Sequence, residues 1–487
     1  MSSSTTLALG QANYTLLDVL NDDNAKVASL SKRGSTETLS AVKRGGEISD
    51  IDIGIVGMVN GLTTLNVADR SSDLSYRENF DVANSTVDSK INLLAGSFDS
   101  TFELGNGDNR FNAATYLMYS EVTSHEGDDT IRIGGSADGT FVSTGDGDDQ
   151  FTANRGSEGL DVAMGEGDDT ALFLGTLTAG TNIVTPTEYN VDLYDEDYFV
   201  INDGENIVDM GSGDDSVTFL GGVRGGSFGS TGYEIQLGAG YDTVVFGANS
   251  RSDGFVLNTG TGSDEVTLGR TTTNAEIDLG WDNGGEEYHQ NTDLYFEQGD
   301  YMLLGVGATL EDSVIRSGQS NDTLILAGTV ADTTLELGWG NADVDVSGAV
   351  GFSDDTEALW DLGGGNDTLT FREYSDISLL GNESYGYFGL GTGADSLNLL
   401  GTGYGEWGAI EFDLGDDNDI DTIEFDLNSA YSGLLINNFG DEDILIIGDS
   451  DYGYEDLFNS VGNYDDDLST FLAAGNEIRN VYGESIF

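Results

Sequence analysis

The stretch that decides the fold covers residues 142–174 and reads VSTGDGDDQFTANRGSEGLDVAMGEGDDTALFL. It contains a glycine-aspartate turn, GDGDD, which returns twenty residues later as GEGDD. Apolar and polar residues alternate on both sides of each turn, and a period of two is the signature of a β-strand. The stretch therefore predicts a repeating unit of strand, turn and strand.

Similar turns recur through most of the chain. The clear copies follow Gly-x-Gly-x with Asp149, Asp169, Asp215, Asp242, Asp264, Asp367 and Asp395, and copies with one glycine fewer carry Asp129 and Asp322. Degraded copies carry Asn109, Asp343 and Asp421. Most intervals between turns are about 20 to 28 residues. A period of this length, kept over several hundred residues, predicts a solenoid.

The residues that flank each turn indicate how the coils pack. The second and fourth residues after the aspartate are apolar, as Leu369 and Phe371 show, and so are the residues just before the first glycine, such as Trp360 and Leu362. We predict two strands per coil, paired in parallel with the next coil, around a continuous core that includes Trp360. Glycine turns would then follow one edge, and loops of variable length the other. Examples of such loops are GTLTAGTNIVTPTEYN and GWDNGGEEYHQNTD, which begin at residues 175 and 280.

The two ends of the chain differ from the repeat. Residues 1–60 hold five of the 17 basic residues, and Leu16, Leu17, Leu20 and Val27 lie at a loosely helical spacing. We therefore expect a partly helical cap or attachment segment at 1–60, a solenoid at 61–450, and a cap or a secretion or assembly segment at 451–487. The predicted fold is all-β, a right-handed parallel β-helix or β-roll-like solenoid with a short helical N-terminal segment.

The composition limits the partners of the chain. It carries 88 acidic and 17 basic residues, for a net charge of −71, so nucleic acid and anionic membranes are not expected as partners, whereas cations are. Hydrophobic residues make up 38% of the chain, which argues against disorder. No apolar run has the length of a transmembrane helix. The first residues lack a basic start followed by an apolar core, so a cleaved secretory signal is not expected.

The chemistry of the turns points to calcium. A column of aspartates, one per coil, repels itself unless it is neutralised. Glycine permits positive φ, so carbonyl oxygens can join the carboxylates as ligands, and six or more hard oxygen ligands suit Ca²⁺ better than the tighter octahedron of Mg²⁺. Zinc is disfavoured because the chain has no cysteine and only His125 and His289. The alternative is a plain β-helix with metal-free turns.

The turns resemble the nonapeptide of the RTX calcium-binding repeat family, Gly-Gly-x-Gly-x-Asp-x-U-x, where U is a large apolar residue. LGGGNDTLTF, at residues 362–371, is the closest copy. The resemblance implies a parallel β-roll in which aspartate side chains and loop carbonyls bind Ca²⁺ between coils. It assigns this role to Asp129, Asp149, Asp169, Asp215, Asp242, Asp264, Asp322, Asp367 and Asp395, and to the glycines Gly145, Gly147, Gly165, Gly167, Gly211, Gly213, Gly363 and Gly365.

This version of the repeat is degenerate. Leu, Met or Thr mostly replaces the first glycine, and one motif occurs per coil where the β-roll has two. Calcium is therefore predicted on one edge only. The stretch LLINNFGDEDILIIGDSDYGYEDLF, at residues 434–458, looks like the closing portion of RTX domains. The resemblance also implies type I-like export through an uncleaved C-terminal signal.

Three functions are compatible with these observations. The first is a calcium-stabilised structural or adhesive protein without catalysis, located extracellularly or on a cell surface as in a surface layer or matrix, which associates with itself or binds a cell-surface or glycan partner. The second is a virion fibre, spike or capsid appendage. The third, less favoured, is a polysaccharide-degrading enzyme, because lysine is absent after Lys90 and no His-Glu-x-x-His motif occurs.

Overall fold

The computed structural model describes most of the chain beyond residue 100. The described residues are 16–20, 26–33, 36–42, 49–54, 63–68, 76–81, 88–93, 96–98, 100–180, 206–225, 232–280, 299–353, 359–373, 375–379, 385–404, 410–417, 419–426, 430–448, 450–459, 466–480 and 482–486. They form two compact units, Met1–Ala239 (unit 1) and Gly240–Phe487 (unit 2). Strands account for 54% and helices for 3%, and the strands form long parallel sheets, so the predicted all-β solenoid is confirmed.

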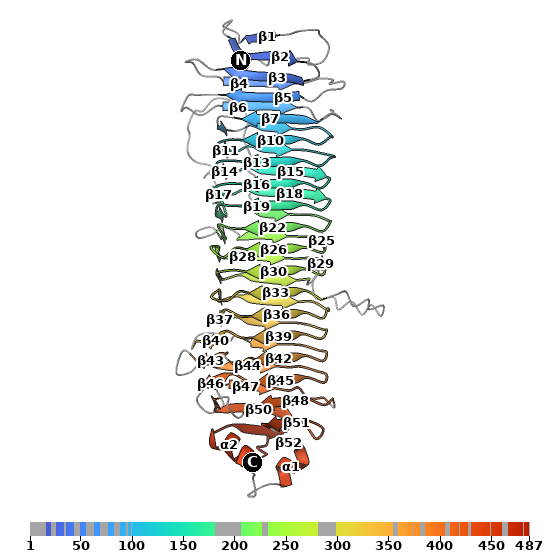
Figure 1. The fold of residues 1–487 in the computed structure, drawn as a ribbon, viewed down its shortest axis with the longest axis vertical. Helices are drawn as coiled ribbons and strands as arrows, with labels where there is room; N and C mark the ends of the chain where they lie inside the picture. The colour runs from blue at the N-terminus through green and yellow to red at the C-terminus, as the bar shows by residue number, and fades with distance from the viewer. Residues whose placement is uncertain are drawn as a thin grey trace, which may run out of the picture. The chain divides into compact units, whose positions relative to one another are not determined.

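Unit 1 consists of coils whose strands stack on successive faces, in parallel except for the first three strands (Figure 1). The strands of its first face are β1 (Leu16–Leu20), β2 (Lys26–Arg33), β3 (Thr36–Val42), β5 (Thr63–Ala68), β7 (Ser89–Leu93), β10 (Arg110–Ala113), β13 (Thr130–Ile133), β16 (Gln150–Ala153), β19 (Thr170–Phe173) and β22 (Ser216–Phe219). Those of its second face are β4 (Ser49–Gly54), β6 (Tyr76–Asp81), β8 (Ser97–Phe98), β9 (Thr101–Glu103), β11 (Leu117–Met118), β12 (Glu121–Thr123), β14 (Ala137–Asp138), β15 (Phe141–Asp146), β18 (Asp161–Glu166), β21 (Ile207–Asp209) and β24 (Tyr233–Gln236). A third face holds β17 (Ser157–Glu158), β20 (Leu177–Thr178) and β23 (Val223–Arg224).

Unit 2 repeats this plan. Its first face holds β26 (Thr243–Phe246), β30 (Glu265–Leu268), β33 (Tyr301–Leu304), β36 (Thr323–Leu326), β39 (Asp343–Val346), β42 (Thr368–Phe371), β45 (Ser396–Leu399), β48 (Thr422–Phe425), β51 (Ile444–Ile447) and β52 (Ser450–Gly453). Its second face holds β28 (Phe255–Asn258), β32 (Glu276–Leu279), β35 (Val314–Ser317), β38 (Thr334–Glu336), β41 (Leu359–Asp361), β44 (Gly386–Gly389), β47 (Ile410–Asp413), β50 (Leu434–Phe439) and β53 (Glu477–Asn480).

The third face of unit 2 holds β27 (Arg251–Asp253), β31 (Thr271–Thr273), β34 (Thr309–Glu311), β37 (Thr329–Ala331), β40 (Ala349–Phe352), β43 (Asp376–Leu379), β46 (Thr402–Tyr404) and β49 (Ala430–Ser432). Two further short strands, β25 (Ala239–Gly240) and β29 (Thr261–Gly262), lie in the glycine turns. The third face corrects the predicted two strands per coil. The segment expected to be a variable loop contains a strand of its own, because residues such as Val330 and Val350 continue the apolar alternation into the core.

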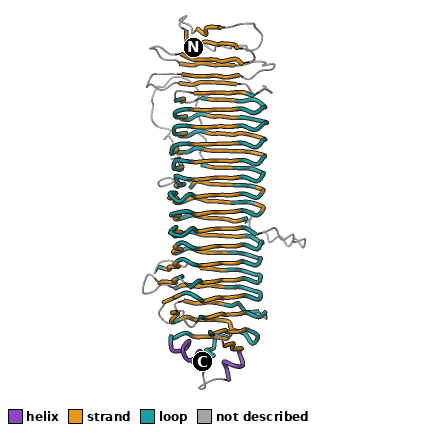
Figure 2. The backbone as a smooth tube through the Cα atoms, viewed as in Figure 1, coloured by secondary structure: helices purple, strands orange, loops and turns teal. Residues whose placement is uncertain are grey.

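The prediction that the long insertions are loops stays untested. Most of the stretches that begin at residues 175 and 280 lie outside the described residues. The tube in Figure 2 shows how short strands and turns alternate within each coil of the described parts.

Register between coils explains the core of each unit. In unit 1, β13, β16, β19 and β22 pair in parallel, so that Ile131, Phe151, Ala171 and Val217 lie in register and are all buried. One residue in two faces inward, and equivalent inward residues stack from coil to coil. The rings of Phe173 and Phe219 stack with centroids 5.0 Å apart.

Trp360 confirms its predicted place in the core of unit 2. It is fully buried, and its indole N–H donates a hydrogen bond of 3.1 Å to the carbonyl oxygen of Thr333. Its ring lies against Phe371 and Phe388, with centroid distances of 6.3 Å and 5.1 Å. The large apolar surface and the satisfied N–H both stabilise this position.

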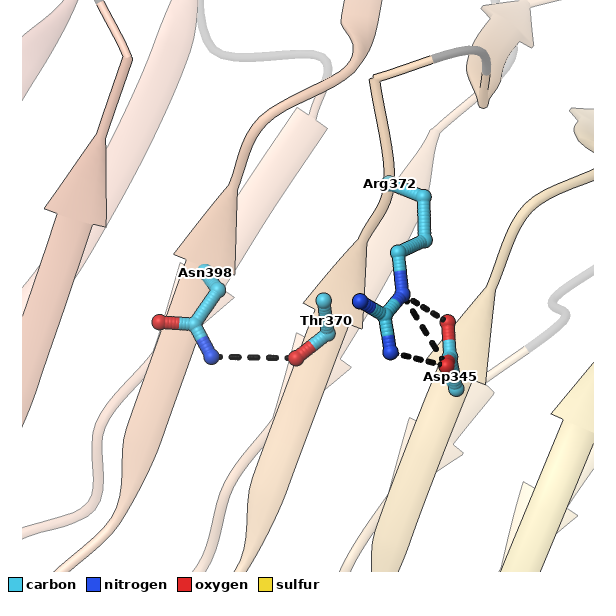
Figure 3. Close-up of polar contacts among 4 residues, drawn as sticks. All are labelled: Asp345, Thr370, Arg372 and Asn398. Atoms are coloured by element: carbon cyan, nitrogen blue, oxygen red, sulfur yellow. Dashed lines mark hydrogen bonds and ion pairs between the residues drawn. The ribbon is translucent and has the colours of Figure 1, made fainter.

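The outward-facing side chains of the first face pair across coils. In unit 2, Arg372, which directly follows β42, donates to both carboxylate oxygens of Asp345 on β39, and its Nε lies 2.8 Å from Oδ1 (Figure 3). On the other side, the Asn398 amide donates to the Thr370 hydroxyl at 3.0 Å. Such side-chain pairs add to the backbone ladder on a solvated sheet face.

The predicted helix near the N-terminus is wrong. Residues 16–20 and 26–33 form β1 and β2, which pair antiparallel, and β2 pairs antiparallel with β3. The spacing of Leu16, Leu20 and Val27 is compatible with a helix, but the intervening Asn-Asp-Asp-Asn favours a turn, and Gly34-Ser35 between β2 and β3 is a hairpin signal. Strand pairing therefore overrides the weak helical spacing. The strand β3 continues into the parallel ladder through β5.

The C-terminal part contains the described helices of unit 2. These are α1 (Tyr454–Asn459) and α2 (Asp466–Ala473), which are purple in Figure 2. After them, β53 pairs in parallel with β50. The rings of Phe425 and Phe471 meet edge to face with centroids 5.2 Å apart, so α2 packs against the last coils. No helix in the described part of the chain is long and apolar enough to cross a membrane.

Candidate metal site

The turn glycines are required by the close stacking of the coils. Gly165 has φ of +112°, and a Cβ at this position would lie 1.9 Å from the carbonyl oxygen of Gly145 in the preceding coil. Gly365 has φ of +148°, and its Cβ would lie 1.9 Å from the carbonyl oxygen of Gly340. No other residue fits both conditions. The same combination of positive φ and a close carbonyl holds for the other predicted glycines, Gly145, Gly147, Gly167, Gly211, Gly213 and Gly363.

The motif aspartates form a buried row, which we call the inner row. In unit 1 it consists of Asp129, Asp149, Asp169 and Asp215, and in unit 2 of Asp242, Asp264, Asp300, Asp322, Asp367, Asp395, Asp421 and Asp443. The backbone N–H of one member donates to Oδ1 of the member in the next coil. The distance is 2.8 Å from Asp149 to Asp169, and 2.7 Å from Asp367 to Asp395. The inner row thus satisfies backbone amides that would otherwise be buried without an acceptor.

This structural role was not part of the prediction, which treated the aspartates as metal ligands alone. Asp300 and Asp443 were also missed, because their turns lack the paired glycines. The signal that identifies them is the alternation after the aspartate: Met302 and Leu304 follow Asp300, and Leu445 and Ile447 follow Asp443.

One degraded copy was placed one residue too far along the chain. In LGWGNADVDV the inner-row position belongs to Ala342, whose N–H donates to Oδ1 of Asp367 at 2.7 Å. Asp343, the predicted aspartate, is exposed on β39. The inner row therefore lacks a carboxylate at this coil.

The second carboxylate oxygen of the inner row sets the electrostatic problem of the site. Within the described residues, Oδ2 is buried and has no hydrogen-bond partner in Asp149, Asp169, Asp322, Asp367 and Asp395. Burial, which disfavours the charged form, raises the pKa of Asp149 to about 6, of Asp169 to about 8, and of Asp367 and Asp395 to about 7. A bare carboxylate at these positions is therefore unfavourable, and a proton or a cation would relieve it.

Asn109 shows what surrounds this second atom. It occupies the inner-row position of the first described turn, and its N–H donates to Oδ1 of Asp129 at 2.6 Å. Its Nδ2, which stands where the aspartates carry Oδ2, donates to the carbonyl oxygens of Gly105 at 2.6 Å and Gly107 at 2.7 Å. The position thus lies among oxygen acceptors and favours a group with positive character.

A second row of polar side chains, the outer row, lies one residue before the inner row and is exposed. In unit 1 it consists of Asp88, Asp108, Asp128, Asp148, Asp168 and Asp214, and in unit 2 it includes Asn321, Asn341 and Asn366. Its hydrogen bonds run in the opposite direction along the chain. The N–H of Asp168 donates back to Oδ1 of Asp148 at 3.1 Å, and the N–H of Asn366 donates back to Oδ1 of Asn341 at 2.7 Å. Each turn is therefore held to the coil on either side.

These residues fit a calcium ion in donor chemistry. The turns of Asp149, Asp169, Asp322, Asp367 and Asp395 each combine a buried carboxylate oxygen without a hydrogen-bond partner and nearby backbone carbonyl oxygens, and hard oxygen ligands of this kind suit Ca²⁺. At Asp129, by contrast, Oδ2 accepts a hydrogen bond from the Ser124 hydroxyl. No group of three or more carboxylate, histidine or cysteine side chains converges within the described residues, so backbone oxygens would supply most of the ligands. His125 is exposed, with Nε2 3.8 Å from Glu103 Oε1, and His289 lies outside the described residues. No protein-family model and no curated protein matches the chain.

Proposed function

We propose that the protein is a calcium-stabilised structural or adhesive protein that works outside the cell or on a cell surface. The observation that carries the proposal is the repeated buried Oδ2 without a hydrogen-bond donor, for example in Asp169 and Asp395. A single such atom could be a local defect. Its recurrence at equivalent positions of successive turns indicates that each turn is built around a further group.

That further group must be positively charged or a proton donor. At Asn109 the side-chain amide fills this need by donating to two glycine carbonyls. At the aspartate turns a divalent cation would neutralise the carboxylate and use the same kind of carbonyl oxygen as a ligand. Calcium accepts irregular sets of six to eight oxygens, whereas Mg²⁺ requires a near-ideal octahedron and keeps its waters.

The proposed location follows from the expected strength of the sites. One carboxylate per turn, with carbonyls as the remaining ligands, gives less negative charge than a site with several carboxylates. Calcium affinity decreases as the negative charge of the ligands decreases. Extracellular modules bind Ca²⁺ with dissociation constants of about 10⁻⁴ to 10⁻³ M, which suits an extracellular calcium level. A chain that needs calcium for rigidity would therefore be fully stable only outside the cell.

The proposed structural or adhesive role is supported by the regularity of the surface. Coils in register present equivalent side chains at every repeat, and solenoids use such extended surfaces to bind partners or further copies of themselves. We propose self-association or a cell-surface or glycan partner, and no catalysis.

Calorimetric melting tests the calcium requirement. The full-length protein is melted in millimolar Ca²⁺, in the same concentration of Mg²⁺, and in excess chelator, and bound ions are counted by native mass spectrometry. We expect several Ca²⁺ per chain and a melting temperature that falls on chelation and is restored by Ca²⁺ but not by Mg²⁺. Equal melting temperatures in all three conditions, with no bound metal, would contradict the proposal.

A second measurement tests the location. The protein is traced by antibody in its source, in the culture medium, in the cell-surface fraction and in purified virions. Recovery from the medium or the surface supports the proposal. Recovery with virions would instead support a virion appendage.

A further inference from the structure

The outer row differs in charge between the two units. In unit 1 it is built from aspartates, and in unit 2 the equivalent hydrogen bonds are accepted by Asn321, Asn341 and Asn366. The bond accepted by Asn341 is 2.7 Å long, and that accepted by Asp148 is 3.1 Å long. The fold needs a side-chain oxygen at this position, and an amide supplies it without a charge.

The aspartates of unit 1 therefore add a charge that the backbone does not require. Neighbouring coils of a parallel sheet lie about 4.8 Å apart, so exposed carboxylates in register repel one another. The residue just before the second turn glycine adds to this charge in three turns of unit 1, where it is Glu126, Asp146 or Glu166, whereas Asn106 and Ser212 are uncharged. At the same position most turns of unit 2 have uncharged residues, among them Trp339, Gly364 and Thr392, and Asp416 is an acidic exception.

Each outer aspartate is also the chain neighbour of an inner-row aspartate. Asp148 precedes Asp149, and Asp168 precedes Asp169, and the Oδ2 atoms of Asp149 and Asp169 are buried without a hydrogen-bond partner. In unit 2 the neighbours of the equivalent Asp367 and Asp395 are Asn366 and Ala394. The residue directly before the inner-row aspartate is therefore charged in these turns of unit 1 and uncharged in these turns of unit 2, although Asp417 lies near Asp395 and accepts from the N–H of Gly393 at 2.8 Å.

We propose that the outer aspartates of unit 1 raise the affinity of its inner-row turns for a divalent cation, so that unit 1 fills at a lower free Ca²⁺ concentration than unit 2. This inference rests on the proposed function. A row of exposed carboxylates attracts Ca²⁺ from solution and lowers the free energy of the ion once it lies in the adjacent turn. Two carboxylates near a divalent ion at a solvated edge strengthen its binding by the turn on the order of tenfold. Salt screening reduces this effect.

Hydrogen exchange at graded free Ca²⁺ concentrations tests the inference on the full-length protein. Protection is followed in peptides that contain Asp149 and Asp169 of unit 1, and in peptides that contain Asp367 and Asp395 of unit 2. We expect unit 1 to gain protection at a lower Ca²⁺ concentration. The substitution D148N/D168N should raise the unit 1 midpoint about tenfold, and the unit 2 midpoint should stay in place.

Two further variants separate charge from structure. N341D/N366D should lower the midpoint of unit 2, because it adds the charge that unit 1 already has. E121Q/E158Q removes two exposed carboxylates of unit 1 outside the glycine turns and should leave the unit 1 midpoint nearly unchanged. In chelator, D148N/D168N should melt at or above the temperature of the wild type, since Asn keeps the hydrogen bonds and relieves repulsion. A purely structural role would lower that melting temperature instead.

The outcomes distinguish the inference from the proposal beneath it. Equal midpoints for the two units, or no change with D148N/D168N, would overturn the inference while calcium binding stands. No Ca²⁺-dependent protection in either unit would overturn the proposed function and the inference together.

Discussion

The backbone N–H of Asp149 donates a hydrogen bond of 2.8 Å to Oδ1 of Asp169, its equivalent one coil later. One oxygen of the Asp169 carboxylate thus holds the backbone of the preceding turn, and the other is buried without a hydrogen-bond partner among the described residues. The two oxygens have different tasks, and substitutions can separate them.

Replacing Asp169 with Asn should change stability in opposite directions with and without calcium. Asn keeps Oδ1 for the Asp149 amide and puts an amide in the place of Oδ2, as Asn109 does. In chelator, relief of the buried unpaired oxygen should raise the free energy of unfolding by about 1–3 kcal/mol. In saturating Ca²⁺ the variant should bind fewer ions and melt below the wild type. Thermal melting of variant and wild type in both conditions, with bound ions counted by native mass spectrometry, measures this reversal of relative stability.

Asp169→Ala is the matched control for this prediction. It removes both oxygens and leaves the Asp149 amide without an acceptor, so it should destabilise in both conditions. A loss of stability for Asp169→Asn in chelator as large as that for Asp169→Ala would show that Oδ2 needs no positive partner.

Replacing Gly165 with Ala should strongly destabilise unit 1. The residue has positive φ, and the new Cβ would lie 1.9 Å from the carbonyl oxygen of Gly145. The backbone conformation alone costs about 1–3 kcal/mol, and the contact adds to this. Gly305→Ala is the control, because its Cβ would meet its nearest neighbour at an ordinary 3.5 Å from the Leu268 carbonyl oxygen. Denaturant unfolding should show a large loss of unfolding free energy for Gly165→Ala and a small one for Gly305→Ala. Similar losses for the two variants would refute the steric explanation.

Stability without metal should fall as the pH rises. Burial raises the pKa of Asp149 to about 6, of Asp367 to about 7 and of Asp169 to about 8, from an unfolded value near 3.8. The folded state holds these protons more tightly than the unfolded state, so the stabilisation is complete below about pH 4 and is lost as the pH rises to about 8. Melting in chelator at pH 5, 6, 7 and 8 should show a steady decline. Saturating Ca²⁺ should flatten it, because the ion replaces the proton. A melting temperature that rises over this range in chelator would refute the assigned pKa shifts.

Core and surface contacts of unit 2 should differ clearly in their effect on stability. Trp360→Ala removes a fully buried ring and should cost about 3–5 kcal/mol. Arg372→Ala breaks the pair with Asp345 that Figure 3 shows, but the arginine side chain is 57% exposed, so the loss should be below about 1 kcal/mol. Chemical denaturation of the two variants in the same buffer measures both values. An equal cost would mean that the outer face contributes as much as the core.

The local pattern of the sequence predicted much of the fold. Alternation around each Gly-x-Gly-x-Asp turn predicted parallel strands in stacked coils, and the buried residues Val217, Phe219 and Trp360 follow that alternation. It also predicted glycine where the coils approach closely, as at Gly165. Strand period and turn chemistry are local properties, and a single repeat already expresses them.

Other features depended on contacts between coils. The helix expected near Leu16 is a strand, because pairing with a neighbouring strand outweighs a weak helical spacing. Asp300 belongs to the inner row although its turn lacks the glycine pair, because strand register places it there. Calcium ligation itself stays a prediction.

By itself, the sequence determined the repeat, the apolar alternation and the positions of the carboxylates. Only the tertiary structure decided which carboxylate oxygen accepts a backbone hydrogen bond and which is buried without a partner. Oδ1 of Asp169 meets an amide that is twenty residues away along the chain, and Oδ2 is buried only once the coils stack. The physical reason is that a hydrogen bond between coils, and the desolvation that accompanies it, exist only after distant residues have come into register.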